Sequence, residues 1–239
     1  MHYCGEPCDG MLLLVHGAGN NCGVWEEFAS YLGLPWVAVD LPGHGKSGGD
    51  GFESISDYAR SVADFVESLK VKDVVLVGHS MGGAIVQAVM AENPSWLKAG
   101  VLVSTGPKLK VNPAIFEGLE REPEATIGKV ARWAVAKGAP EDVVERTRAI
   151  FSSAPVEVVI KDFRACDAFD GEGLCSSVKV PVLVVVGSED VMTPPKLSKR
   201  LVELIPEARL EVIEGAGHML QLERPKELAR VIVDFVKGL

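Results

Sequence analysis

VVLVGHSMGG, residues 74–83, joins a β-branched run to a serine flanked by glycines. The first four residues predict a buried strand, and the apolar residues 84–91 that follow predict a helix. A serine in a G-x-S-x-G pattern at such a turn is typical of a nucleophile elbow. Gly78 and Gly82 have no Cβ, so strand and helix can approach closely around a strained Ser80. The Ser80 hydroxyl would then project at a helix N-terminus, where developing negative charge is stabilised.

A histidine suited to act as a base follows another strand-like run, residues 210–213. The next residues read Glu214-Gly215-Ala216-Gly217-His218, and the two glycines would let this loop fold back toward Ser80. The alternative is a surface-loop or helix-capping histidine. Because a serine nucleophile needs a base, we expect His218 to remove the Ser80 proton.

A carboxylate that could orient this base is expected between the serine and the histidine. Residues 182–186 form a strand-like run, and Gly187-Ser188-Glu189-Asp190 follows it. Open α/β sheets place their ligands beyond the carboxyl ends of parallel strands, which is where both acids would lie. Asp190 is therefore a candidate, with its neighbour Glu189 as the rival acid. Asp190 could instead be a solvated loop carboxylate or a cap for the next helix.

Two backbone donors for an oxyanion can also be assigned. One is the N–H of Met81, the residue after the serine, and the other should come from the loop after an early strand. Residues 12–15 predict that strand, and His16-Gly17-Ala18-Gly19 follows it, so the Ala18 N–H is the second expected donor. His16 could be mistaken for a base, but we interpret its ring as holding the loop in place.

Five segments, in this order and over nearly the whole chain, make the sequence resemble the α/β-hydrolase fold superfamily of esterases, lipases, perhydrolases and C–C hydrolases. The resemblance implies a triad of Ser80, Asp190 and His218, with Asp190 preferred to Glu189. A serine nucleophile departs from the superfamily's haloalkane dehalogenases, which use an aspartate. The superfamily uses this constellation for many reactions, so the substrate is not specified. The matching segments are His16–Gly19, Asp40–Ser47, Gly78–Gly83, Gly187–Asp190 and Gly215–His218.

Strand-like runs alternate with amphipathic helices, which predicts an α/β fold with a mostly parallel central sheet and helices on both faces. Only about ten residues precede Met11, so at least one of the superfamily's two N-terminal strands should be missing or very short. The expected strands lie near 11–16, 35–39, 73–78, 99–104, 181–186 and 208–213. The expected helices lie near 22–32, 55–70, 81–92, 195–205 and 219–237.

The alternation breaks between Gly106 and Gly173, where prolines punctuate several helical segments. We expect a helical cap over residues 106–173, inserted into an α/β-hydrolase core formed by residues 1–105 and 174–239. Most of its apolar stripe should pack against the core. A few of its aromatic residues could instead face the substrate pocket, and the candidates are Phe116, Trp133 and Phe163. The expected cap helices are 113–119, 124–137, 141–151 and 156–168.

Net charge and composition limit the classes of molecule that the protein is expected to bind. The 239 residues carry a formal net charge of -9, which argues against nucleic acid and anionic membranes as partners. No uncharged apolar run reaches the roughly 18 residues of a membrane span. The N-terminus lacks the basic and apolar regions of a signal peptide, so a cytoplasmic location is expected. The oligomeric state is left open.

Neither a metal nor a nucleotide is expected. The five cysteines are scattered and odd in number, which indicates free thiols. His2, Cys4 and Cys8 do not have the spacing of a metal site, because no second ligand pair follows. Residues 43–48 fit G-x-G-x-x-G, but no helix opens at these glycines, so we interpret them as a structural loop.

These features together predict a serine hydrolase that cleaves carboxylic esters of small, soluble, fairly apolar substrates through an acyl-Ser80 intermediate, without a cofactor. With the same triad the reaction could instead be C–C bond, thioester or lactone hydrolysis, or cofactor-free perhydrolysis. A small-molecule receptor on a hydrolase fold is the alternative from outside the enzymes.

Overall fold

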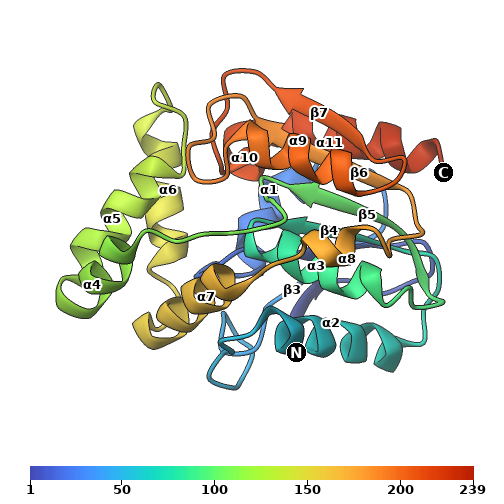
Figure 1. The fold of residues 1–239 in the computed structure, drawn as a ribbon, viewed down its shortest axis with the longest axis horizontal. Helices are drawn as coiled ribbons and strands as arrows, with labels where there is room; N and C mark the ends of the chain where they lie inside the picture. Colours follow the sequence, from blue (N-terminus) through green and yellow to red (C-terminus); the bar gives the residue numbers. More distant parts are fainter.

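The computed structural model describes residues 1–239 and has a seven-stranded sheet at its centre (Figure 1). Its middle strands are short runs of leucine and valine whose residues are buried on both faces, as parallel sheets covered by helices require. The strands are β1 (Tyr3–Gly5), β2 (Leu12–Val15), β3 (Trp36–Val39), β4 (Val74–His79), β5 (Leu97–Val103), β6 (Val182–Gly187) and β7 (Arg209–Ile213), in the spatial order β1-β3-β2-β4-β5-β6-β7.

All neighbouring strands are parallel except β1, which pairs antiparallel with β3 at the edge of the sheet. One short strand thus stands where the superfamily has two. Cys4 on β1 brings its Sγ to 3.1 Å from the Sγ of Cys22, but all five cysteines are free thiols.

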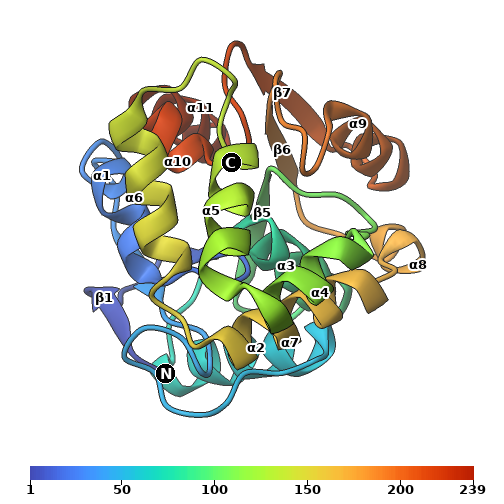
Figure 2. The same ribbon diagram turned by 90° about the vertical axis from the view of Figure 1, so that its left-hand side faces the viewer.

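Helices cover both faces of the sheet, as the sequence predicted. Helices α2 (Ile55–Leu69), α3 (Met81–Ala91), α8 (Glu172–Cys175) and α9 (Pro195–Leu204) pack side by side on one face. A 3₁₀ turn (Cys22–Trp25), α1 (Glu26–Ala29), α10 (Leu220–Glu223) and α11 (Pro225–Lys237) cover the other. Figure 2 shows α1 and α11 on one side of the sheet, with α8 and α9 on the opposite side.

Two predicted helices are interrupted. The segment 22–32 forms only the 3₁₀ turn and the four-residue α1. The segment 219–237 is broken at Arg224, whose φ of -140° and ψ of 51° are not helical. The break has a local cause, because Pro225 disfavours the helical conformation at the residue before it.

Four helices between β5 and β6 lie beyond the carboxyl ends of the strands, and the strand arrows in Figure 1 point toward them. Each begins beside a proline, which suits the first turn of a helix because its missing N–H needs no partner there. Their apolar stripe, including Ile127, Val130 and Ala134, belongs to the same core cluster as the sheet. The division into core and cap domains stays a prediction. The helices are α4 (Pro113–Arg121), α5 (Pro123–Trp133), α6 (Glu141–Phe151) and α7 (Val156–Ala168).

None of the helices combines the length and the apolar character needed to span a bilayer.

Candidate active site

Ser80 occupies a strained turn between β4 and α3. Its φ of 55° and ψ of -117° are unusual for a residue with a side chain, and such conformations cost on the order of 1–3 kcal/mol. A Cβ on Gly78 would overlap the backbone of Gly82, and a Cβ on Gly82 would overlap the carbonyl groups of Val15 and His16. The two flanking glycines are therefore required by steric contacts with β2 and α3, and these contacts hold Ser80 in its turn.

His218 and Asp190 form a buried pair beside this turn. The distance from His218 Nδ1 to Asp190 Oδ2 is 2.9 Å, and only 3% of Asp190 is exposed. Asp190 also accepts hydrogen bonds from the N–H groups of Met192 and Thr193 and from the Thr193 hydroxyl. Burial alone would raise the pKa of Asp190, but His218 and the donated hydrogen bonds bring it below its ordinary value. The carboxylate therefore stays ionised and can hold the Nδ1–H tautomer of His218.

The backbone of the His218 loop is attached to the turn that follows α5. The N–H of His218 donates to the carbonyl of Ala134 at 2.9 Å. Glu223 accepts hydrogen bonds from the N–H groups of Ala136 (2.8 Å) and Gly217 (3.0 Å), so one carboxylate bridges the two segments. Burial raises the pKa of Glu223. The position of His218 thus depends on residues between β5 and β6 as well as on its own strand.

The elbow itself supports the same loop. The Nε2–H of His79 donates to the carbonyl oxygen of His218 at 3.0 Å. Burial and the neighbouring His218 lower the pKa of His79 to about 3, so its ring is neutral. The residue before the serine therefore fixes the histidine loop and takes no part in proton transfer.

The N–H groups of Ala18 and Met81 lie near Ser80 and have no acceptor within the protein. Met81 is the first residue of α3, so its N–H is one of the groups a helix leaves unpaired. Gly17 lies so close to Ser80 that a Cβ on it would be 3.1 Å from the Ser80 Cβ. Both donors could therefore serve a negatively charged oxygen beside Ser80.

A fully buried carboxylate anchors the loop that carries Ala18. Asp162 of α7 accepts hydrogen bonds from the Gly19 N–H (2.8 Å) and the Tyr58 hydroxyl (2.6 Å). Its third partner is Nε2 of His44, at 2.7 Å. Burial would lower the pKa of His44, but the hydrogen bond and the charge of Asp162 raise it. Asp162 thus ties α7 to the loop after β2 and to the loop after β3.

His16 stabilises the same loop from the other side, as its sequence position suggested. Its Nδ1 donates to the carbonyl of Gly17 at 2.8 Å, and its Nε2 accepts from the N–H of Leu41 at 3.1 Å. Burial, the largest influence, lowers the pKa of His16 to about 3, so the ring is neutral as these bonds require.

Ser80, His218 and Ala18 line one cavity of about 290 Å³. Of the three aromatic residues predicted to face the pocket, Phe163 lines this cavity. The prediction was wrong for Trp133, which is 51% exposed, and for Phe116; neither lines the cavity. The turn at the end of α5 leaves Trp133 on the outer surface.

Three residues that support the site were missed from the sequence: Asp162, Thr193 and Glu223. Only Asp162 gave a usable signal, because it shares the buried face of α7 with Val159, Phe163 and Cys166.

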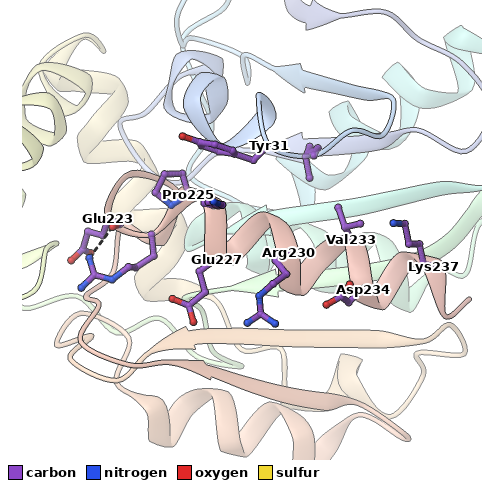
Figure 3. Close-up of a pocket in the computed structure, with 11 residues that line it drawn as sticks. Tyr31, Glu223, Pro225, Glu227, Arg230, Val233, Asp234 and Lys237 are labelled. Carbon is purple, nitrogen blue, oxygen red and sulfur yellow. Dashed lines mark hydrogen bonds between the residues drawn. The ribbon is translucent and has the colours of Figure 1, made fainter.

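A second concave region lies apart from the Ser80 cavity, although Glu223, which supports the His218 loop, lies on its wall. A broad, open groove of about 830 Å³ runs along α11, where Tyr31, Glu227 and Arg230 lie on its walls (Figure 3). Its charged residues are of both signs and none of the predicted site residues lines it, so we assign it no chemistry.

Comparison with known proteins shows which family and which enzymes this chain is similar to. A model of the alpha/beta hydrolase family matches residues 12–231. A pimeloyl-[acyl-carrier protein] methyl ester esterase from Yersinia pseudotuberculosis is 26% identical and aligns over 98% of this chain and 95% of its own length. A putative carbamate hydrolase from Pseudomonas savastanoi is 23% identical over 100% of this chain and 98% of its own. The structure of a thermophilic esterase superposes with a TM-score of 0.86 at 34% identity, covering 99% of this chain and 92% of that one.

The pairing of His218 with Asp190 predicts different effects for the two neighbouring acids. Asp190→Asn should lower kcat for ester substrates about ten-thousandfold, because it allows the wrong His218 tautomer. Glu189→Gln should be nearly silent, since the only hydrogen bond of the Glu189 side chain is the one it accepts from the Lys137 N–H at 3.3 Å. Steady-state kinetics of the two variants are the test, and the reverse pattern would identify Glu189 as the acid.

The buried Asp162 predicts an effect at a distance from Ser80. Asp162→Asn leaves one acceptor oxygen for three donors, so the loop carrying Ala18 should shift and kcat should fall about 10- to 100-fold. Stability should also fall, by on the order of 1–3 kcal/mol for the unpaired donors. Glu157→Gln, at an exposed position of the same helix, is the control for kcat and Tm. A folded Asp162→Asn variant with wild-type kcat would show that the loop does not need this anchor.

Proposed function

The chain belongs to the alpha/beta hydrolase family, and from this premise we propose that it is a serine carboxylesterase acting on small soluble esters through an acyl-Ser80 intermediate. One observation carries the proposal. Ser80 and His218 line the same cavity, and Asp190 is hydrogen-bonded to Nδ1 of His218. Relatives named as ester hydrolases support the reaction class.

The proposed reaction has two steps. His218 takes the proton of Ser80 as its oxygen attacks the ester carbonyl, and Asp190 stabilises the imidazolium that forms. The N–H groups of Ala18 and Met81 bind the oxyanion, and each such donor is typically worth about 3 kcal/mol. His218 then returns the proton to the departing alcohol. In the second step it deprotonates a water molecule that attacks the acyl-Ser80 ester, and it gives that proton to the Ser80 oxygen as the carboxylic acid leaves.

No metal or cofactor is needed for this sequence of steps, because the protein's own groups supply the nucleophile, the base and the oxyanion donors. A cytoplasmic location remains a prediction. A panel of p-nitrophenyl esters separates the esterase from a small-molecule receptor on the same fold, since a receptor would show a ligand-induced thermal shift without turnover.

Removing the proposed nucleophile is the first test. Ser80→Ala should lower ester turnover by several orders of magnitude with an unchanged Tm, because members of a triad act as a unit. An organophosphonate should label wild-type protein at Ser80 alone, as read by mass spectrometry of its peptides. An adduct at another residue, or full activity in the alanine variant, would refute the assignment.

Cavity size predicts the preferred acyl length. About 290 Å³ lies at the small end of ligand pockets, which run from roughly 300 to 1,000 Å³. Each methylene buried in it should contribute about 0.8 kcal/mol until the chain meets the wall. Values of kcat/KM should therefore peak within roughly C2 to C8, without activation at an oil interface. A rate still rising at C12 to C16, or a jump on emulsified triglyceride, would contradict a short pocket.

A further inference from the structure

The cavity that contains Ser80 is lined by charges of one sign. Lys108, Lys110 and Lys196 lie on its wall, and no carboxylate does. The protein as a whole carries a net charge of -9, so three cations without an acid are contrary to the average composition of its surface. The rest of the lining is mostly apolar, including Leu109, Phe163 and Met192 in addition to the residues already described.

Two of the three lysines have partners outside the cavity. Lys108 Nζ lies 3.0 Å from Asp170 Oδ2 and 3.7 Å from Glu172 Oε2. Lys110 Nζ donates to the carbonyl of Asp167 at 2.6 Å and lies 3.8 Å from the carboxylate of the same residue. Neither aspartate lines the cavity, so these contacts hold the lysines from outside it. Such exposed pairs are weak and leave the ammonium groups able to bind a further anion.

Lys196 has no hydrogen bond or ion pair within the protein. It lies in the first turn of α9, a turn that contains no acidic residue. The helix macrodipole disfavours a cation at this end, so the position is slightly destabilising for a lysine. Lys196 is exposed, so water solvates its ammonium group, and no partner within the protein competes for it with an anion that enters the Ser80 cavity.

We propose that Lys196, supported by Lys108 and Lys110, binds a carboxylate carried by the ester substrate several carbons from the scissile bond. The substrate class is then an ester with a free carboxylate, such as the half-ester of a dicarboxylic acid. Its methylenes would lie against the apolar wall, with the ester at Ser80 and the carboxylate at the lysines. This inference rests on the proposed function, because it concerns the same cavity.

The test compares anionic and neutral esters of equal length. One pair places the charge on the acyl side, 4-nitrophenyl hydrogen adipate against 4-nitrophenyl hexanoate. The other places it on the alcohol side, 6-acetoxyhexanoate against hexyl acetate. In wild-type protein the anionic member of at least one pair should have the higher kcat/KM, mainly through a lower KM. Its advantage should shrink as NaCl screens the charges.

Substitution then assigns the effect to one residue. Lys196→Met should lower the anionic-to-neutral ratio about 5- to 10-fold, as expected for a partly exposed charge-assisted contact, and Lys196→Glu should lower it further. Lys199→Met, on the same helix but outside the cavity, is the matched control and should leave the ratio unchanged. Wild-type ratios at or below one in both pairs, or ratios insensitive to Lys196, would overturn the proposal.

A binding measurement separates this inference from the proposed function. Ser80→Ala protein is titrated calorimetrically with methyl hydrogen adipate and with its neutral analogue methyl adipamate. Tighter binding of the anion that is lost in the Ser80→Ala, Lys196→Met double variant supports the anion site even if no ester is turned over. Equal binding of the two compounds refutes it even if neutral esters are good substrates.

Discussion

The arrangement around Ser80 depends on one buried carboxylate. Asp162 is fully removed from water and accepts three hydrogen bonds, from the loop after β2, from the loop after β3 and from α2. A buried charge is tolerated only when its partners are in place, because an unpaired one costs several kcal/mol. The loop with the proposed oxyanion donor, the helices between β5 and β6 and the core therefore have one compatible arrangement.

The strain at Ser80 has a similar origin in close packing. The left-handed turn persists because β2, β4 and α3 approach so closely that only glycine fits on either side of it. The histidine loop is held by hydrogen bonds to the Ala134 carbonyl, to Glu223 and to the ring of His79. The Ser80 turn, the histidine loop and the loop that carries Ala18 are thus fixed before any substrate arrives. Such preorganised groups are usually the largest single contribution to catalysis.

Local patterns made much of this predictable from the sequence. The parallel strands follow from β-branched runs, and the elbow, histidine and acid candidates follow from motifs at the ends of those runs. The supporting contacts were not predictable, because Asp162 and Glu223 meet partners 143 and 87 residues away in the chain. The prediction that Trp133 lines the pocket was wrong for a related reason. Helical spacing shows which residues share a face of the helix, but it does not show what that face contacts. The break at Arg224 does have a sequence signal, because Pro225 disfavours the helical conformation at the residue before it.

The hydrogen bond from the His218 N–H to Ala134, and the one from the Ala136 N–H to Glu223, bear on how this architecture can diversify. A segment whose residues line the Ser80 cavity would ordinarily be free to change as new substrates are selected. Here the same segment carries part of the scaffold for the histidine, so exchanging residues 106–173 for those of a relative would disturb the base together with the specificity. Viable chimaeras would have to transplant the partners of Ala136 and Asp162 as a set, so that mutations between β5 and β6 are constrained in groups and not position by position.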